Sequence, residues 1–475
     1  MHFKLRKQHI FFILIALLSL LCVLLTACSQ EKEQLTATAP QQIYTPAPSH
    51  SPQIDTREKV TLNGAEVDCY SDPLSPGTRY VLLRDVMDAI ESTYIYDSTL
   101  KQWQFYWRDQ PCTLTRDSNI LTYGDKEIEL AEAPFVCRVT LKEEPAVIVD
   151  EANNYLYYGD ERYSLDDAPQ KYLDKVNHGA HNVDDQNRIV VTPEPYAASD
   201  YLFIPIESFC EGLEMGSLYD SANNMLYISP GAGNWTLAEG YSVPVIMHYA
   251  TGEQWHTDMR YRELDDIEKE FQYLSANGYT FIWFEDLWNV ENIEKPVIMT
   301  FDDGFKSNYD YLMPLAVKYN AKVTEFIVPG NMDSNLTTSS QVYMSTDEIK
   351  EFYETGLLSI QCHTMNEDYD ILSLTGTAME NEVVNCKLFI TRLTGQVPFV
   401  FAYPYGEQYQ DKPGVYNDEM LSLVKANYRF AVTSADTLSY TTGNNPYTIP
   451  RLYLGFYDDQ ENFVYYMEHG RLPEE

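Results

Sequence analysis

Apolar segments of strand length alternate with helical segments from Val243 onward. Short apolar runs such as "PVIMTF" (296–301) and "LLSIQC" (357–362) predict strands, whereas residues 264–274 carry apolar side chains at helical spacing. About seven strands with helices between them are expected, and this alternation is typical of parallel sheets. We therefore predict an α/β domain over residues 241–475, folded as a distorted (β/α) barrel of about seven strands. A doubly wound open sheet is the alternative.

An internal repeat organises the segment before this domain. Residues 81–105 align without gaps with residues 204–228, at an offset of 123 residues. Both copies are predicted to form a strand, an amphipathic helix and a strand, and Tyr-Asp-Ser stands at the same turn in each. Repeated units that cannot each bury an apolar face are expected to share one core. We predict a smaller α+β domain of duplicated strand–helix–strand units over residues 59–240, with a structural or wall-binding role.

The N-terminal residues are typical of an export signal. Basic residues precede an apolar run of sixteen residues, Ile10–Leu25, in which Ser19 is the one hydroxyl residue and which is short for a membrane-spanning helix. The sequence Leu-Thr-Ala-Cys that ends at Cys28 resembles a bacterial lipobox. We expect residues 1–27 to be a lipoprotein signal peptide, Cys28 to be lipidated, and the protein to lie on the extracellular face of the membrane. Residues 28–58, rich in Pro, Ser, Thr and Gln, predict a tether.

Composition excludes several partners. The formal net charge of −38 disfavours nucleic acid and anionic membrane surfaces, because phosphate groups are bound by clustered Lys and Arg. Any membrane contact is therefore expected through the lipid anchor alone. The six cysteines beyond Cys28 contain no C-x-x-C pair, so a zinc knuckle is not expected.

Three polar clusters follow predicted strands of the C-terminal domain. They are "TFDDG" (300–304), "HTMNE" (363–367) and "AYPYG" (402–406). Each alone has a simpler interpretation, since Asp-Asp-Gly is common in turns and a single His after a strand is commonly structural. The carboxyl ends of parallel strands meet at one edge of a barrel, where barrel enzymes carry their active sites. The three clusters together therefore predict an active site.

With these clusters, residues 243–455 resemble a NodB-type polysaccharide deacetylase domain of carbohydrate esterase family 4. The landmarks "VPVIMHY", "GYTFIWFEDL" and "IPRLYL" are most similar to the branch that contains poly-N-acetylglucosamine deacetylases. The segment before them resembles the copper-amine-oxidase-type N-terminal module of secreted bacterial wall proteins, a name that implies no copper here. The first resemblance implies a metal-dependent hydrolase that removes N-acetyl groups from a glycan.

The resemblance also implies roles for individual residues. Asp303 and His363 are expected to bind the metal, and Asp302 is expected to be the general base. The backbone N–H of Tyr405 is expected to point at the developing oxyanion. These roles match the chemistry, because amide hydrolysis needs a Lewis acid, an activated water, an oxyanion stabiliser and a proton donor.

The sequence departs from the family pattern at three positions. Ala402 stands where the family often has Arg, and Arg451 is expected to orient Asp302 instead. The family's catalytic acid usually comes from Met-Tyr-His, but this chain has Met-His-Tyr, so His248 is displaced by one residue and needs a bulge to face the site. Glu367 occupies the place of the second metal-binding histidine.

Two functions remain open from the sequence. In the first, the chain is a lipid-anchored deacetylase of cell-wall or matrix glycan, such as peptidoglycan or poly-N-acetylglucosamine, with Asp303, His363 and Glu367 as metal ligands. The metal would be Zn, or Mn, Mg or Co if the carboxylate of Glu367 shifts the preference. In the second, the domain has lost turnover and holds glycan as a binding lipoprotein.

Overall fold

The computed structural model describes most of the chain beyond residue 49. The described ranges are 50–55, 57–139, 147–150, 152–158, 161–165, 180–183, 188–192, 199–252, 261–333, 342–366, 373–404, 418–434, 439–454 and 460–470. All of them belong to one compact unit, His50–Glu475. The predicted signal peptide, Cys28, most of the predicted tether, Glu367 and Tyr405 lie outside these ranges, so the predictions made for them stay predictions.

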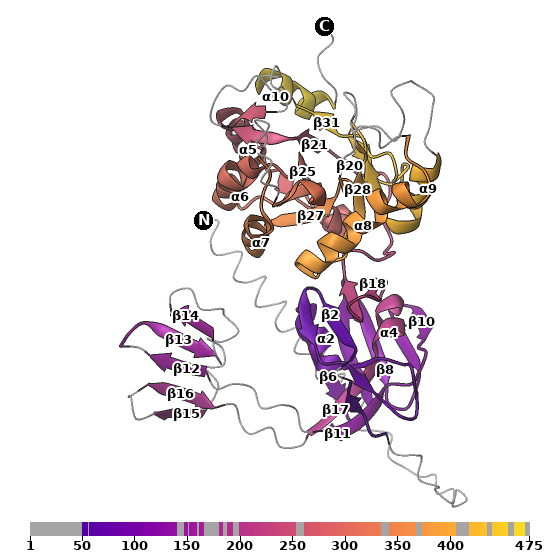
Figure 1. Cartoon of the computed structure of the whole chain (residues 1–475). Helices are drawn as coiled ribbons and strands as arrows, with labels where there is room; N and C mark the ends of the chain where they lie inside the picture. Colours follow the sequence, from indigo (N-terminus) through magenta and orange to yellow (C-terminus); the bar gives the residue numbers. More distant parts are fainter. Residues whose placement is uncertain are drawn as a thin grey trace, which may run out of the picture. The chain divides into compact units, whose positions relative to one another are not determined.

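A parallel sheet forms the centre of the C-terminal part (Figure 1). Its order is β29-β28-β27-β26-β25-β21-β31, and every neighbouring pair is parallel. The strands are β21 (Val245–His248), β25 (Pro296–Asp303), β26 (Val323–Ile327), β27 (Leu358–Cys362), β28 (Val400–Ala402), β29 (Phe430–Val432) and β31 (Leu452–Tyr453). The short β24 (Thr280–Phe281) pairs with β25 outside this path.

The two ends of this strand order approach each other. Ile449, three residues before β31, forms an isolated parallel bridge with Val432 of β29. The N–H of Ile449 donates to the carbonyl of Ala431 at 2.9 Å, and the N–H of Thr433 donates to the carbonyl of Ile449 at 2.8 Å. The segment 449–453 therefore contacts β29 at one end of the order and β21 at the other. This arrangement fits a distorted barrel of seven strands better than an open sheet.

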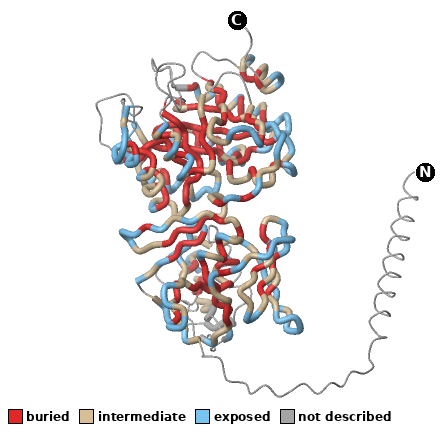
Figure 2. Tube along the Cα trace, turned by 90° about the vertical axis from the view of Figure 1, so that its right-hand side faces the viewer, coloured by how far each residue is buried: buried red, intermediate tan, exposed pale blue. Residues whose placement is uncertain are grey.

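Helices cover the outside of the sheet. They are α5 (Leu264–Ala276), α6 (Met313–Tyr319), α7 (Thr346–Glu354), α8 (Thr377–Thr394), α9 (Asp418–Asn427) and α10 (Gln460–His469). The predicted helix over residues 264–274 corresponds to α5, whose Ile267, Phe271 and Leu274 are buried. Figure 2 shows buried residues gathered in the middle of the C-terminal part, with intermediate and exposed residues around them, as expected for amphipathic helices on a core.

Strand β25 shows how the barrel separates its two faces. Val297, Met299 and Phe301 pack in the cluster shared with the helices, whereas Ile298 packs in the interior cluster with Phe326 of β26. All eight residues of β25 are buried. Because side chains alternate along a strand, Asp302 shares the interior face with Ile298.

The repeat predicted before the barrel is present as two copies of the same elements. The first is β5 (Tyr80–Leu82), α2 (Leu83–Ala89), β6 (Tyr94–Asp97) and β7 (Gln102–Trp107); the second is β17 (Ser199–Pro205), α4 (Ile206–Gly212), β18 (Gly216–Asp220) and β19 (Met225–Ser229). The equivalent residues Val81 and Ile204 pair directly in antiparallel register. Val86 of α2 and Phe209 of α4 lie in one hydrophobic cluster, so the two copies share a core as expected.

The structure contains further strands that the sequence analysis did not predict individually. A five-stranded antiparallel sheet runs β10-β9-β8-β7-β6, and another, β14-β13-β12-β16-β15, has its own small apolar cluster around Val147, Val149 and Leu156. Their strands are β8 (Gln110–Thr115), β9 (Ile120–Tyr123), β10 (Lys126–Glu129), β12 (Val147–Asp150), β13 (Tyr155–Tyr158), β14 (Glu161–Ser164), β15 (Ala180–Val183) and β16 (Ile189–Thr192). The second sheet lies between the two copies in the sequence and has an apolar cluster of its own, separate from the core that the copies share.

Short elements complete the described chain. They are β1 (Gln53–Ile54), β2 (Lys59–Leu62), β3 (Ala65–Val67), β4 (Tyr70–Ser71), β11 (Phe135–Val139), β20 (Ser242–Val243), β22 (Ala250–Gly252), β23 (Tyr261–Glu263), β30 (Tyr440–Thr441), the 3₁₀ segments η1 (Phe284–Asn292) and η3 (Pro329–Asn331), and the π-helical η2 (Asn308–Leu312). Within the ranges described above, no helix combines the length and apolarity that crossing a membrane requires. The six cysteines found there are all free thiols.

Direct bonds join the duplicated units to the barrel. Arg392 of α8 donates to both carboxylate oxygens of Asp220, at 2.7 and 2.8 Å. The N–H of Val397 donates to the hydroxyl of Ser229 at 2.6 Å, and the Gln396 amide donates to Asn63 at 2.7 Å. The Arg392 guanidinium lowers the pKa of the Asp220 carboxyl well below its ordinary value. These contacts connect β2, β18 and β19 to the end of α8.

Candidate active site

Asp302 and Arg451 form a buried, two-pronged ion pair. Arg451 Nη1 donates to Asp302 Oδ1 at 2.7 Å, and Nη2 donates to Oδ2 at 2.8 Å. Both residues are almost fully buried, at 1% and 0% exposure. Arg451 also donates to the hydroxyl of Thr300 and the carbonyl of Thr433, both at 3.1 Å. The planar guanidinium therefore fixes the orientation of the carboxylate, as charge-assisted pairs of this geometry do.

Asp303 has a strained backbone that turns it away from Asp302. Its φ is +73°, and Gly304 follows with φ of +77°. An L-residue with a side chain rarely adopts this left-handed region, and the strain costs of order 1–3 kcal/mol. A strained conformation of this kind persists only where the surrounding structure holds the residue in place. The consequence is that two adjacent carboxylates leave the end of β25 in different directions.

His363 faces Asp303 from the end of β27. Its Nδ1 lies 2.8 Å from the carbonyl oxygen of Ala402, which can only accept, so Nδ1 carries the proton in the neutral ring. The other nitrogen, Nε2, then presents a lone pair and lies 3.5 Å from Asp303 Oδ1. His363 and Asp303 are each 1% exposed. Two strands thus bring a nitrogen and a carboxylate oxygen to one point.

This pair fits a divalent metal. Zinc binds His nitrogen and carboxylate oxygen at about 2.0–2.2 Å, so two ligands at the tetrahedral angle lie roughly 3.4 Å apart. The observed 3.5 Å between Nε2 and Oδ1 agrees with that separation. The carbonyl of Ala402 also fixes the ring, as partners of metal-binding histidines commonly do. No cluster of three or more potential ligands occurs among the residues with described positions, and the third expected ligand, Glu367, is not one of them.

A glutamate on α8 holds the segment that follows His363. Glu382 accepts from the N–H of Asn366 and from its side-chain amide, both at 2.7 Å. The N–H of Met365 donates to the carbonyl of Glu382 at 3.0 Å. A Cβ on Gly330 would lie 2.4 Å from Asn366 Oδ1, so only glycine allows this close approach. The described start of the loop is therefore fixed on both sides.

His248 is not brought to this cluster. The pairing of β21 with β25 is continuous, and His248 stands opposite Phe301 on the face covered by helices. Its Nε2 lies 2.9 Å from Glu270 Oε2 in α5, and Arg262 Nη2 lies 2.8 Å from Oε1 of the same carboxylate. Burial would raise the pKa of Glu270, but the charges of His248 and Arg262 lower it. No bulge restores the expected orientation, so we leave His248 out of the site.

Tyr249 takes the side of the strand end that was expected for a histidine. Burial, together with the charges of Asp302 and Asp303, raises the pKa of its phenol well above the ordinary value. Its ring packs edge-on against Tyr453 of β31, with 5.5 Å between centroids. The sequence analysis missed this residue, although the order Met-His-Tyr in place of Met-Tyr-His was the available signal.

The third polar cluster is described only in part. Ala402, Tyr403 and Pro404 are buried at the end of β28, and the carbonyl of Ala402 accepts from His363. Tyr405, the expected oxyanion residue, follows directly but lies outside the described residues. His469, near the C-terminal end of the described chain, bonds within α10 through Nδ1 to the carbonyl of Tyr465 at 2.8 Å.

The chain is similar to known polysaccharide deacetylases. Residues 289–429 match the family model described as polysaccharide deacetylase. The chain is 25% identical over 175 residues to the YxkH protein of Bacillus subtilis, covering 36% of this chain and 57% of that protein. It is also 25% identical over 199 residues to the poly-beta-1,6-N-acetyl-D-glucosamine N-deacetylase of Staphylococcus aureus, covering 39% of this chain and 65% of that protein.

These curated relatives are thus matched over less than two thirds of their own length. A solved structure, a Streptococcus pyogenes deacetylase in complex with acetate, is 23% identical, with a TM-score of 0.41 and coverage of 48% of this chain and 99% of that one. That structural likeness is weak. The family match includes the Asp302–Asp303 pair and His363, which the structure brings together. The chain is thus similar to polysaccharide deacetylases over residues 289–429.

Proposed function

We propose that the protein is a metal-dependent deacetylase that hydrolyses N-acetyl groups of a cell-wall or matrix glycan. The observation that carries the proposal is the arrangement of two carboxylates with separate partners. Asp302 is held by Arg451, and Asp303 faces Nε2 of His363 at 3.5 Å. One carboxylate is thus available to handle a proton, while the other helps to hold an ion.

Asp303 and His363 would hold the metal, and Glu367 is the proposed third ligand. The ion, Zn or else Mn, Mg or Co, would supply Lewis-acid polarisation of the acetamide carbonyl and of water. A carboxylate in place of a second histidine adds negative charge to the ion's surroundings, which weakens a Lewis acid. We expect activity to depend strongly on which metal is supplied.

Asp302 is the proposed general base. Both of its oxygens are held by Arg451, so the carboxylate keeps one orientation toward a water placed above the strand end. A positioned base of this kind contributes typically 10²- to 10⁴-fold to the rate. The backbone N–H of Tyr405 is the proposed oxyanion donor. Tyr249, with its raised pKa, keeps its proton at neutral pH and is the proposed polar contact on the leaving-group side.

The substrate is proposed from chemistry and from the relatives' names. A neutral N-acetylated glycan suits a protein with a net charge of −38, since anionic polymers would be repelled. Poly-N-acetylglucosamine is favoured by the Staphylococcus aureus relative, and peptidoglycan is the other candidate. Lipidation at Cys28 would place the enzyme on the extracellular face of the membrane, within reach of either polymer.

A glycan-binding protein without turnover is the second candidate. The observation that favours it is the placement of His248 on the outer face, which removes the expected histidine proton donor from the described part of the site. A phenol is a poorer acid than an imidazolium near neutral pH. The substitution at Glu367 points the same way.

Acetate release from β-1,6- and β-1,4-linked N-acetylglucosamine oligomers tests the proposal. The full-length protein is stripped of metal and assayed with Zn, Mn, Mg or Co added singly. We expect release with at least one metal and its loss in the Asp302→Asn variant. If no metal gives acetate release but the protein still binds the oligomers, the proposal of an enzyme is wrong and the protein is a glycan-binding protein.

A further inference from the structure

A cavity of about 910 Å³ lies at the barrel end opposite to the active site. Its walls include the start of β27 at Leu358 and Ser359, and Phe399 just before β28. The active-site residues instead follow the carboxyl ends of β25 and β27. None of Asp302, Asp303 and His363 lines the cavity, so it does not belong to the site described above. Its volume falls in the range of small-molecule sites, about 300–1,000 Å³.

The duplicated units supply the other wall. Asn63, Tyr106 and Arg108 line the cavity from β2 and the β7–β8 hairpin. The bond from Gln396 to Asn63 and the bond from Val397 to Ser229 hold this wall against the barrel. A Cβ on Gly231 would lie 2.7 Å from Glu285 Cγ, so the chain between the two parts also packs closely. The cavity is therefore built from both parts of the chain.

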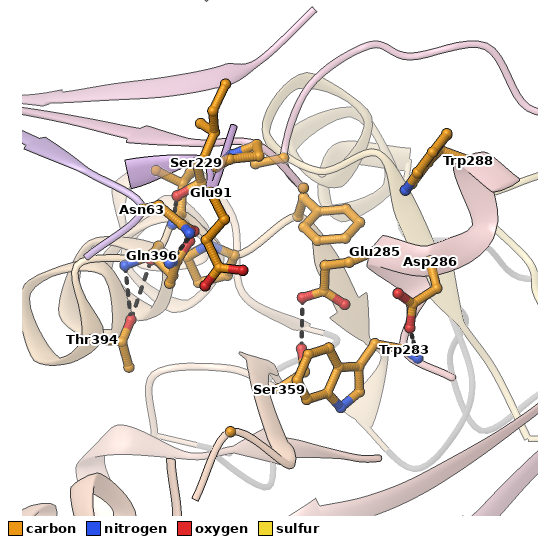
Figure 3. Close-up of a pocket in the computed structure, with 18 of the residues that line it drawn as sticks. Asn63, Glu91, Ser229, Trp283, Glu285, Asp286, Trp288, Ser359, Thr394 and Gln396 are labelled. Carbon is orange, nitrogen blue, oxygen red and sulfur yellow. Dashed lines mark hydrogen bonds between the residues drawn. The ribbon is translucent and has the colours of Figure 1, made fainter. Parts of the chain in front are cut away.

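Aromatic rings and polar groups alternate on its walls. The rings are those of Tyr106, Trp107, Trp283, Trp288, Tyr353 and Phe399. Figure 3 shows Trp283 and Trp288 on the barrel side, with Glu285 between them and Asn63, Glu91 and Gln396 across the space. Rings of this kind offer flat apolar faces, and the amides and carboxylates beside them offer donors and acceptors.

Two buried polar atoms, one on each wall of the cavity, can form a further hydrogen bond. Glu285 Oε1 accepts from the Ser359 hydroxyl at 2.8 Å and from the Gln361 amide at 3.2 Å, whereas Oε2 is buried without a hydrogen-bond partner. On the opposite wall, Arg108 Nη2 donates to the carbonyl of Pro230 at 2.5 Å. Among the described residues Nη1 makes no hydrogen bond of good geometry, although the guanidinium lies near the Tyr123 phenol and the rings of Trp107, Trp235 and Trp288. Buried polar atoms are normally hydrogen-bonded. Glu285 Oε2 as an acceptor and Arg108 Nη1 as a donor are therefore available to bind a ligand.

We propose that this cavity binds an uncharged oligosaccharide of N-acetylhexosamine. The sugar's flat C–H faces would pack on the rings, a hydroxyl would donate to Glu285, and a hydroxyl or acetamide oxygen would accept from Arg108. Glu91, Asp109, Asp286 and Glu354 give the lining more carboxylates than cationic groups, which disfavours anionic ligands. The choice of glycan rests on the proposed function, whereas the existence of a polar ligand rests on the cavity alone.

Such a site would hold the polymer away from the reacting residue. A glycan chain bound at the end of the barrel and by the duplicated units would stay with the protein between hydrolytic events. This gives the duplicated units a binding role beside the deacetylase domain. When one polymer occupies two weak sites of the same protein, its overall affinity rises without new contacts at the reaction centre.

The test measures oligomer binding in a protein that cannot turn over. Calorimetric titration of the full-length Asp302→Asn protein with a β-1,6-linked N-acetylglucosamine pentamer is compared with the same protein carrying Tyr106→Ala or Trp288→Leu. Tyr106 is 66% exposed, so its removal should leave the fold intact. Tyr96→Ala on the adjacent strand β6, 45% exposed and outside the cavity, is the matched control.

We expect each cavity variant to weaken binding about two- to twelvefold, because an aromatic contact of about 0.5–1.5 kcal/mol is lost. The Tyr96→Ala control should bind like its parent. Equal affinity in all four proteins, or no binding by the parent, would overturn the proposed cavity site. If cavity-dependent binding persists while wild type releases no acetate, the proposed enzyme fails and the binding site stands.

Discussion

Removing Arg451 should destabilise the barrel more than removing most surface charges. Arg451→Met keeps much of the apolar stem but deletes the guanidinium that bonds Asp302 at 2.7 and 2.8 Å. The carboxylate, 1% exposed, then lacks its charged partner inside the barrel. Breaking a buried pair in this way costs about 3–5 kcal/mol. The bonds to Thr300 and Thr433 are lost as well.

A double-mutant cycle separates the pair from its surroundings. Asp302→Asn and Arg451→Met are measured singly and together by urea unfolding, followed by near-UV circular dichroism. Each single variant leaves one buried group without its partner, whereas the double variant leaves neither charge. We expect the double variant to lose about 1–3 kcal/mol less than the sum of the single losses. Additive losses would show that the two side chains stabilise the fold independently and refute the orienting role.

Other predictions concern the active site and its support. Asp302→Asn should lower acetate release about 10²- to 10⁴-fold and keep metal content by mass spectrometry, since Asp302 is proposed as base and not ligand. Glu382→Gln should lower stability by about 1–3 kcal/mol and weaken metal binding, because the amide cannot accept from both donors of Asn366. Calorimetry and metal titration measure both effects. Glu367→His should raise zinc affinity and acetate release together; a gain in neither would count against residue 367 as a ligand.

Local sequence pattern predicted the strand that carries the two aspartates. The eight buried residues of β25 form an apolar run that ends in two aspartates, so both the strand and the position of the carboxylates follow from the sequence. The expectation for His248 shows how far strand periodicity extends. A shift of one residue was predicted to turn the His248 ring to the other face of the sheet unless a bulge intervened. The pairing of β21 with β25 is continuous, so the ring lies on that other face.

Long-range packing determined what the sequence analysis missed. Glu382 lies on a helix 19 residues beyond His363, and no local pattern marks it as the partner of Asn366. Arg451 could be related to Asp302 only through the family resemblance, because the pair spans 149 residues. The cavity that contains Glu285 has two walls from segments far apart in the sequence, and neither segment alone has a pattern that indicates a cavity. Such features depend on how elements meet, which a single sequence does not record.

Glu285 should make stability depend on pH near neutrality. Although the residue as a whole is partly exposed, Oε2 is buried, and burial raises the pKa of the carboxyl from 4.5 to about 7. The unfolded chain ionises near pH 4.5 while the folded chain stays protonated, so this stabilising contribution is complete below pH 4.5 and is lost as pH rises toward 7. The difference in pKa corresponds to at most about 3 kcal/mol.

Glu285→Gln removes the titration while its carbonyl can still accept from Ser359 and Gln361. We therefore expect the variant to gain up to about 3 kcal/mol relative to wild type between pH 4.5 and pH 8. Urea unfolding of both proteins at a series of pH values measures the gain, and Glu354→Gln, an exposed carboxyl on the same cavity, controls for loss of a charge. If a glycan hydroxyl donates to Oε2, saturating oligomer should favour the ionised form and shrink the gain. A pH-independent difference between wild type and Glu285→Gln would contradict the buried carboxyl on which both arguments depend.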